Sequence, residues 1–350
     1  MIQPKTISLL MTDNCNLKCS FCCRRNIAKS PQTITIAQAH KSMEWILDNC
    51  SEDVTVHFWG GEPTLAMDVM KDLLCSYPQI QFVANTNGIV VNDNKDILDF
   101  MIQHAYHFNL QLSISIAYDM KVFDDYFIRF EPLLKVIGQN RWCVNLVLLQ
   151  LDKFVERIDK LYSFGIHQIV IDFPLHAKID ESYIEQATKV LLELCNKYKD
   201  KSPCLSGSGY NFGLYKLAIN QSILEQDNKM YCGSGINRIL IDYDGNLWGC
   251  DGMYELKHKS IGTLDNGFND NINFFKDLSS NHGILCKDCI NCEFEKNCIR
   301  PKCLVANELN SGSFYKIDKD WCKCNQALMN FIKQFQGKKY GHTRELQNIN

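Results

Sequence analysis

The chain has 350 residues, of which 46% are hydrophobic and 22% are charged, and its formal net charge is −3. This composition is typical of a globular protein with a sizeable core, and the small negative charge gives no general attraction to nucleic acid or to an anionic membrane. No run approaches the ~18 apolar residues of a membrane span, and the N-terminus lacks the features of a signal peptide. We therefore expect a cytoplasmic protein that binds neither nucleic acid nor membrane.

Short β-rich runs alternate with helix-like stretches up to residue 200. The predicted strands cover residues 6–12, 54–59, 80–86, 108–117, 143–151 and 167–173. The predicted helices cover residues 35–50, 65–77, 93–107, 118–138, 153–165 and 181–199. Strands that alternate with helices predict β/α units and a parallel sheet. Six units predict an α/β fold with an open, partial (β/α)6 barrel of the TIM type, whose active site lies at the C-terminal ends of the strands.

The pattern changes after Asp200. Residues 201–213 have the composition of a loop or linker, and residues 236–250 predict a hairpin around the turn from Tyr243 to Asn246. A cysteine-rich stretch with little regular core follows, which a metal would stabilise. We expect a barrel at 1–200, a small cysteine-rich domain at 201–336 and a polar tail at 337–350.

Eighteen cysteines are unusual for a protein of a reducing compartment, where they point to metal sites rather than disulfides. Cys15, Cys19 and Cys22 have the spacing C-x3-C-x2-C immediately after the first predicted strand. A closed zinc site has four ligands, commonly in two C-x2-C pairs. Three thiolates on a four-iron cluster leave one iron open for another ligand, and this reading fits the spacing better.

This loop resembles the signature of the radical S-adenosylmethionine (SAM) enzymes, in which an aromatic residue, here Phe21, precedes the last cysteine. The segment "GGEP" after the second predicted strand strengthens the resemblance. The resemblance implies that Cys15, Cys19 and Cys22 hold a [4Fe–4S] cluster that binds SAM. It also implies that Gly60, Gly61, Glu62 and Pro63 hold the methionine end of SAM, with Glu62 accepting from its ammonium group. Taken alone, "GGEP" is better interpreted as a turn with proline at a helix start, and the preceding C-x3-C-x2-C motif favours the cofactor role.

Further residues match the family less specifically. The resemblance places the ends of the third and fourth predicted strands beside SAM, and an arginine that follows them on its carboxylate. In this chain the matching residues are Thr86, Asn87, Ser113, Ser115 and Arg129. The segment after the fourth strand departs from the family, because "SISIAYD" lacks the usual Gly-Pro. Each of these residues is also compatible with a purely structural role.

The C-terminal cysteines resemble a second pattern, the SPASM extension of radical SAM enzymes, which binds two auxiliary iron–sulfur clusters. The resemblance assigns Cys289, Cys292, Cys298 and Cys322 to the outer cluster, and Cys232, Cys250 and Cys303 to the inner one. Two departures are a C-x4-C spacing in place of C-x3-C and an inner cluster one ligand short. Cys204, Cys286 or Cys324 could complete the inner cluster, or one iron could be open to substrate. Cys324 is also an alternative to Cys322, and structural zinc is an alternative for the whole group.

The resemblance implies an enzyme that cleaves SAM to a 5′-deoxyadenosyl radical and abstracts hydrogen from a peptide. Oxidation, or a thioether or carbon–carbon cross-link, would follow. Asp251 matches a proposed general base of the sulfatase maturases, although it could equally belong to a turn. Alternatives are an oxidoreductase or epimerase of a sugar or aminocyclitol, and a non-catalytic metal-stabilised binding module. We expect an electron donor such as a flavodoxin or ferredoxin as a partner. Because the first strand begins near residue 5, a separate protein could help to recognise the peptide.

Overall fold

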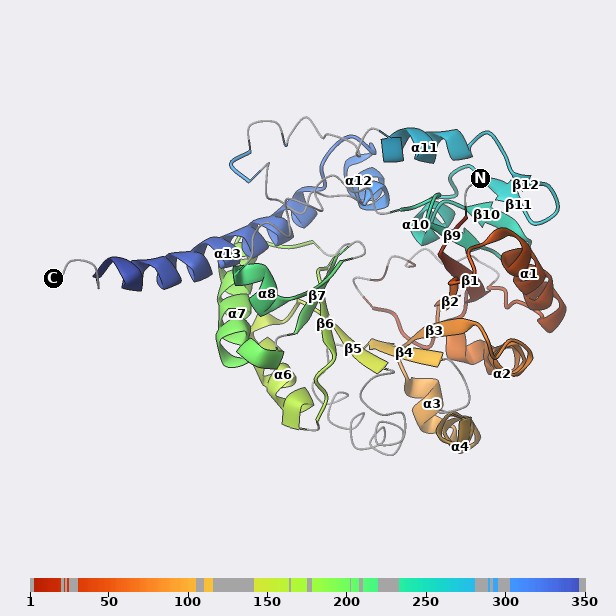
Figure 1. Cartoon of the computed structure of the whole chain (residues 1–350), viewed down its shortest axis with the longest axis horizontal. Coiled ribbons are helices and arrows are strands. Elements are labelled where there is room, and N and C mark those ends of the chain that lie inside the picture. The colour runs from red at the N-terminus through yellow and green to blue at the C-terminus, as the bar shows by residue number, and fades with distance from the viewer. Residues whose placement is uncertain are drawn as a thin grey trace. The chain divides into compact units, whose positions relative to one another are not determined.

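The computed structural model divides the chain into two compact units (Figure 1). The first unit comprises residues 1–145 and 233–281, and the second comprises residues 146–232 and 282–350. The described residues are 3–19, 22, 24, 31–104, 110–115, 142–163, 165–174, 178–201, 203–207, 210–219, 233–280, 289, 292–294 and 303–345. Within these ranges no helix combines the length and apolarity needed to cross a membrane. The boundaries expected from the sequence, at residues 200 and 336, stay predictions.

Parallel strands form the centre of the first unit. They are β1 (Thr6–Thr12), β2 (Thr55–Gly60), β3 (Gln81–Thr86), β4 (Leu110–Ser115) and the first part of β5 (Trp142–Val147). The helices between them are α1 (Ile36–Asn49), α2 (Met67–Ser76), α3 (Ile89–Asp93) and α4 (Lys95–His104), with a 3-10 turn, η1 (Pro63–Ala66), before α2. The predicted α/β class is therefore confirmed. The expected helix at 118–138 lies outside the described residues.

A hairpin from late in the chain extends this sheet. Its strands β9 (Arg238–Ile241) and β10 (Asn246–Trp248) are antiparallel, and Gly245 occupies the predicted turn with φ 80°. Strand β9 pairs in parallel with β1, so that Thr6 lies opposite Arg238 and Leu9 opposite Ile241. The strands β11 (Gly262–Thr263) and β12 (Gly267–Phe268) follow, with helices α10 (Asp251–Glu255) and α11 (Ile272–Ser280). The predicted hairpin thus belongs to the same compact unit as the first strand.

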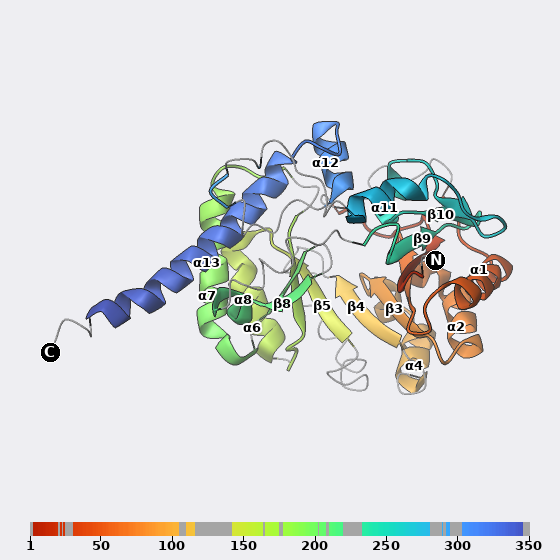
Figure 2. The same cartoon turned by 45° about the horizontal axis from the view of Figure 1, so that its top comes forward.

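The second unit contains the sixth predicted strand, β6 (Ile169–Asp172), which pairs in parallel with β7 (Cys204–Gly207). Strand β8 (Tyr210–Gly213) returns antiparallel to β7, so the segment expected to be a loop at 201–213 forms a second hairpin. The helices are η2 (Leu151–Lys153), α6 (Phe154–Ser163), α7 (Tyr183–Lys197), η3 (Lys199–Lys201), α8 (Leu214–Ile219), α12 (Leu304–Ser311) and α13 (Lys319–Glu345). Helices α7 and α13 lie side by side (Figure 1 and Figure 2). Helix α13 continues to Glu345, so the predicted polar tail is helical over 337–345.

The apolar pattern of β1 and β2 determines which face of the sheet carries polar side chains. Alternate residues of a strand point to opposite faces. Ile7, Leu9, Val56 and Phe58 are completely buried on the face that is covered by helices. Residues between them, such as Ser8, which lies opposite His57, belong to the other face. The polar residues of the unit's interior and the strand ends above them form the candidate site.

Candidate functional site

The three cysteines of the C-x3-C-x2-C motif lie in the loop that leaves β1, and all three are half-buried. The backbone N–H of Leu17 donates to Cys15 Sγ over 3.4 Å, and the N–H of Arg24 donates to Cys22 Sγ over 3.4 Å. Hydrogen bonds to sulfur favour the thiolate form, which is the form that binds metal. At Cys15 this hydrogen bond opposes the larger effect of burial, which raises the pKa of the thiol. Phe21 lies outside the described residues.

The cysteines of the motif lie near one another, since the backbone N–H of Cys22 donates to the carbonyl oxygen of Cys19 over 3.2 Å. Burial raises the pKa of the Cys15 and Cys19 thiols, and the charges of neighbouring cysteines raise both further. Three thiolates in one half-buried place therefore require a positively charged partner. No three His, Cys, Asp or Glu side chains among the described residues are placed to hold a single metal ion. Cysteines that hold an iron–sulfur cluster bind different irons, so this donor set fits a cluster.

Two glycines at the end of β2 allow the cysteine loop to approach closely. Gly60 has φ +146°, and a Cβ on it would lie 2.3 Å from the carbonyl oxygen of Thr12. A Cβ on Gly61 would lie 2.1 Å from the carbonyl oxygen of Asn14. The N–H of Gly61 donates to Thr12 O over 2.8 Å, and that of Glu62 donates to Asn14 O over 2.7 Å. The glycines thus hold the residues that immediately precede Cys15.

We expect the substitution Gly61→Ala to displace the loop and to lower the iron content of the reconstituted protein. The added methyl group meets backbone atoms, which cannot rotate away as a side chain would. Iron and sulfide analysis after anaerobic reconstitution measures the effect. Gly337→Ala is the matched control, because an added Cβ there has no atom within 4 Å. Equal iron contents of the two variants would contradict this role of Gly61.

Glu62 connects the end of β2 to the end of β3 through its carboxylate, and the side chain is only 1% exposed. Its Oε1 accepts from Thr64 N over 3.1 Å, from Thr64 Oγ1 over 2.6 Å and from Thr86 Oγ1 over 2.7 Å. Its Oε2 accepts from Asn87 N over 2.7 Å. A carboxylate has about four acceptor sites, so the protein itself nearly fills its capacity.

The expected cofactor residues of β3 also hold the cysteine loop. The Asn87 side chain donates to Asn16 Oδ1 over 2.7 Å, and Asn16 lies between the first two cysteines of the motif. Asn87 Oδ1 accepts from Ile89 N over 3.0 Å. Thr86 Oγ1 donates to Glu62 and accepts from Gly88 N over 2.9 Å. These polar groups have partners within the chain, so they fix the position of the loop.

The remaining expected cofactor residues are less closely defined. Pro63 begins the 3-10 turn η1 and is buried, as a proline at a helix start would be. Ser113 lies in β4 opposite Asn85 of β3, and Ser115 lies opposite Asn145 of β5. Arg129 lies outside the described residues.

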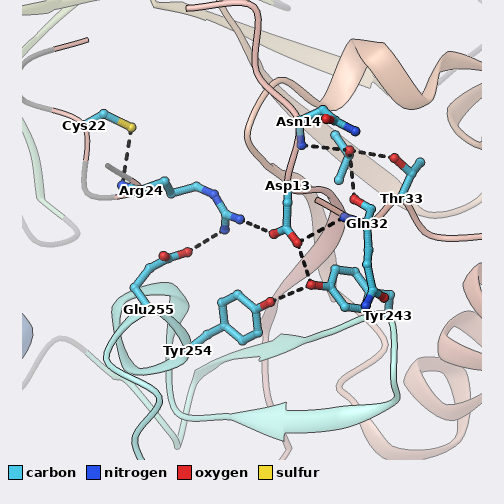
Figure 3. Close-up of polar contacts among 10 residues, drawn as sticks. Asp13, Asn14, Cys22, Arg24, Gln32, Thr33, Tyr243, Tyr254 and Glu255 are labelled. Carbon is cyan, nitrogen blue, oxygen red and sulfur yellow. Dashed lines mark hydrogen bonds and ion pairs between the residues drawn. The ribbon is translucent and has the colours of Figure 1, made fainter. Parts of the chain in front are cut away.

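A buried ion-pair network beside the cysteine loop was not identified from the sequence (Figure 3). Arg24 donates to Asp13 Oδ1 over 2.5 Å, and its other terminal nitrogen lies 2.6 Å from Glu255 Oε1. Tyr243 donates to Asp13 Oδ2 over 2.6 Å, and its hydroxyl lies 2.9 Å from that of Tyr254. Asp13 and Arg24 are 2% and 3% exposed. The network joins both ends of the cysteine loop to β9, β10 and α10.

The same network shifts the proton equilibria of its members. Burial raises the pKa of Glu255 to about 7, although Arg24 and then Lys257 act in the opposite direction. Burial and the bond to Asp13 raise the pKa of Tyr243, and burial raises that of Tyr254. The tyrosines therefore act as neutral donors. In the sequence, the one sign of this network is the charged pair Asp13 and Arg24, which lie two positions before and two positions after the cysteine motif.

Asp251, the candidate base, is the first residue of α10 and contacts β1 and β9. Burial raises the pKa of its carboxyl group, while Arg238, a hydrogen bond with Ser8 and the charge of Arg24 lower it. Its Oδ1 is shielded from solvent and has no hydrogen-bond partner within the described part of the chain. His57 lies opposite Ser8 on the neighbouring strand. Asp251 therefore belongs to a polar group on the inner face of this unit.

His57 should make the protein sensitive to acid. Burial, aided by Arg238, lowers its pKa from 6.5 to about 4, so the folded state resists protonation that the unfolded chain accepts. The resulting stability is fully present above pH 6.5 and is lost as the pH falls towards 4. We expect this effect to lower the free energy of unfolding by about 1 to 2 kcal/mol at pH 5. The range allows for a side chain that is not completely buried. Urea unfolding of the apoprotein at pH 7.5 and pH 5 measures the effect. The loss of stability between the two pH values should be smaller for His57→Gln than for the parent protein, and an equal loss would contradict this role of His57.

The C-terminal cysteines divide between the two compact units. Cys250, in the first unit, precedes α10. In the second unit, Cys303 precedes α12 and its Sγ accepts from Ala306 N over 3.5 Å, while Cys292 N donates to Cys289 O over 3.2 Å. The expected ligands Cys232 and Cys298, and the alternative Cys286, lie outside the described residues, and the alternative Cys204 lies in β7.

Two candidates for the last ligand, both on α13, differ in burial. Cys324 is completely buried, and burial raises the pKa of its thiol. Cys322 is only half-buried and accepts a long contact, 3.8 Å, from Gln326 Nε2. Residues two positions apart on a helix face different directions. Cys322 is therefore the more accessible of the two sulfur atoms.

Comparison with known proteins gives one family and several similar structures. The model of the Radical SAM superfamily matches residues 9–191. Streptococcus suis SuiB bound to precursor peptide SuiA has a TM-score of 0.64 at 17% identity, covering 91% of this chain and 75% of that one. The structure of anSMEcpe with bound AdoMet has a TM-score of 0.66 at 13% identity, covering 97% of this chain and 96% of that one. The structure of anSMEcpe with AdoMet and the Kp18Cys peptide has a TM-score of 0.65 at 14% identity, covering 96% of this chain and 99% of that one. No curated protein matches the chain.

Proposed function

Since the chain belongs to the Radical SAM superfamily, we propose that it is a peptide-modifying enzyme that uses SAM to generate a 5′-deoxyadenosyl radical. The single observation that supports this most is the loop of Cys15, Cys19 and Cys22, which strand ends of the first unit hold in place. The peptide substrate is supported by similarity to SuiB and anSMEcpe, whose structures contain peptides. The expected product is an oxidised or cross-linked residue.

The residues of the first unit would have different roles at the cluster. Cys15, Cys19 and Cys22 would ligate a [4Fe–4S] cluster, which supplies the electron that cleaves SAM. Glu62, Thr86 and Asn87 would act mainly by fixing the loop, because their polar atoms are bonded within the protein. Glu62 Oε2 accepts one bond from the described residues, and we propose it as the atom that receives the ammonium group of SAM.

Ser113, Ser115 and Arg129 are proposed to contact the rest of SAM, and the backbone after Gly60 to line its methionine end. Asp251 is proposed as the base that receives the substrate proton. Its Oδ1, buried and without a hydrogen-bond partner within the described residues, is suited to a proton acceptor. Its raised pKa brings its basicity closer to that of a base that operates near neutral pH.

We further propose two auxiliary clusters in the cysteine-rich region. Cys289, Cys292, Cys298 and Cys322 would hold one, and Cys232, Cys250 and Cys303 the other. The accessibility of Cys322 supports it over the buried Cys324 as the last ligand. The backbone N–H that donates to Cys303 Sγ favours a thiolate there. A flavodoxin or ferredoxin is the proposed electron donor, and a separate protein could present the peptide.

The test is anaerobic reconstitution of the full chain, with iron and sulfide counts and measurement of 5′-deoxyadenosine formed from SAM under reduction. We expect about twelve irons, as three Cys-ligated cubane clusters imply. Cys289→Ala with Cys322→Ala should lower the count while the SAM-cleaving activity without peptide persists. The matched variant Cys324→Ala should keep the iron. Zinc in place of iron, or no 5′-deoxyadenosine, would overturn the proposal.

A further inference from the structure

Among the described residues, one buried cation lies beside the cysteine loop, and the proposed chemistry does not use it directly. The Arg24 side chain is 3% exposed, follows Cys22 by two residues, and donates its own backbone N–H to Cys22 Sγ. The field of its charge therefore arises beside a proposed cluster ligand. Burial makes such a field strong, because little water screens it.

The surroundings of Arg24 hold this charge in one place. Its guanidinium group lies 4.5 Å from the ring centroid of Trp59, a cation–π contact, and 2.6 Å and 2.5 Å from carboxylate oxygens of Glu255 and Asp13. Its Nε is buried without a hydrogen-bond partner among the described residues. The guanidinium group is therefore kept out of the solvent. The two carboxylates that flank it determine how strong its electrostatic field is at the cysteines.

We propose that Arg24 is a positioning residue that sets the reduction potential of the cluster on Cys15, Cys19 and Cys22, and that Glu255 opposes it. The reduction potential of an iron–sulfur cluster depends on nearby charge, on hydrogen bonds to sulfur and on exposure. A fixed positive charge favours the reduced cluster, which carries one more electron, and raises the potential. A fixed negative charge has the opposite effect. This inference rests on the proposed function, because it requires that cluster.

Glu255 gives the arrangement a second consequence. It lies at the end of α10, which begins immediately after Cys250. The Arg24–Glu255 pair therefore joins the first cysteine loop to the segment that carries a proposed ligand of an auxiliary cluster, within one compact unit. Both cysteine segments lie on one buried charge network.

The experiment is a redox titration of the SAM-binding cluster, followed by EPR at pH 8.5, where Glu255 is ionised. It is made in a background in which Cys289 and Cys322 are replaced by alanine to simplify the spectrum. Arg24→Gln should shift the potential to more negative values, and Glu255→Gln to more positive values. Arg24→Lys, which keeps the charge, should restore most of the potential. Lys18→Gln removes the same charge from an exposed position on the same loop, and its shift should be smaller than that of Arg24→Gln.

Opposite shifts distinguish an effect of charge from a loss of structure, which would move both variants in the same direction. If Arg24→Gln does not retain iron, Glu255→Gln against the background protein still tests the proposal. The inference is overturned if Arg24→Gln and Glu255→Gln shift the potential in the same direction. It is also overturned if neither shift is larger than the shift caused by Lys18→Gln. Normal iron and SAM cleavage with unchanged potentials would reject this role of Arg24 alone. Absence of the cluster from the background protein would instead reject the proposed function.

Discussion

Replacement of Cys15, Cys19 and Cys22 together by alanine should abolish the formation of 5′-deoxyadenosine from SAM and remove about four irons from the reconstituted protein. The three thiols share one half-buried loop, and burial and mutual repulsion raise the pKa of Cys15 and Cys19, so the thiolates require a common positively charged partner such as the proposed cluster. Loss of the set removes the only proposed route for an electron to SAM. Chromatographic measurement of 5′-deoxyadenosine after reduction, with iron analysis of the same sample, gives the result.

Cys75→Ala is the matched control for this experiment. Cys75 is an exposed cysteine on α2 and takes no part in the loop. It should retain the iron content and the activity of the parent protein. Residual formation of 5′-deoxyadenosine by the triple variant, above that of a sample without protein, would contradict the assignment of the front cluster.

Glu62→Ala should lower the free energy of unfolding of the apoprotein by about 3 kcal/mol or more, because it leaves several buried donors without an acceptor. Four hydrogen bonds from three residues end on this one carboxylate. Glu62→Gln should cost less than alanine, since its amide oxygen keeps the three donors of Oε1 and only Asn87 N loses its acceptor. Urea titration of the apoprotein, followed by circular dichroism, measures the differences.

The control is Glu185→Ala, which removes an exposed carboxylate that pairs only with Lys189 one turn along α7. Such a solvent-exposed pair contributes little to stability. A cost for Glu62→Ala no larger than that of Glu185→Ala would mean that Glu62 does not hold the strand ends together. A large loss of stability in Glu62→Gln as well as Glu62→Ala would indicate that the charge itself is required.

The alternating pattern of the first 200 residues predicted the β/α units because each unit depends on local periodicity. The strand predicted at 6–12 is β1, and that predicted at 167–173 contains β6. The hairpin at 204–213 was missed, since its glycines and serines resemble those of a loop. The pairing of β9 with β1 was also not predictable, because nothing local relates residues more than 200 positions apart.

The candidate site was predictable where residue type carries the chemistry and not where the partner is distant. Cysteine spacing identifies Cys15, Cys19 and Cys22 without any structure. The sequence also led us to expect Glu62 to face a ligand, yet most of its acceptor capacity is used by Thr64, Thr86 and Asn87. Arg24 and Glu255 each look like an ordinary surface charge in the sequence. Only the fold brings the Arg24 guanidinium nitrogen Nη1 to 2.6 Å from Glu255 Oε1.

The network around Asp13 also bears on when the protein can become competent during its biosynthesis. The bond between Asp13 and Tyr243 joins residues 230 positions apart. A growing chain exposes the cysteine motif early, but the hairpin and helix that lock its ends leave the ribosome only after most of the chain has been made. Closing so long a loop has an entropic cost that only the later contacts offset. Insertion of iron should therefore follow translation of this region, and a chain released before residue 255 should hold the motif in an unlocked form.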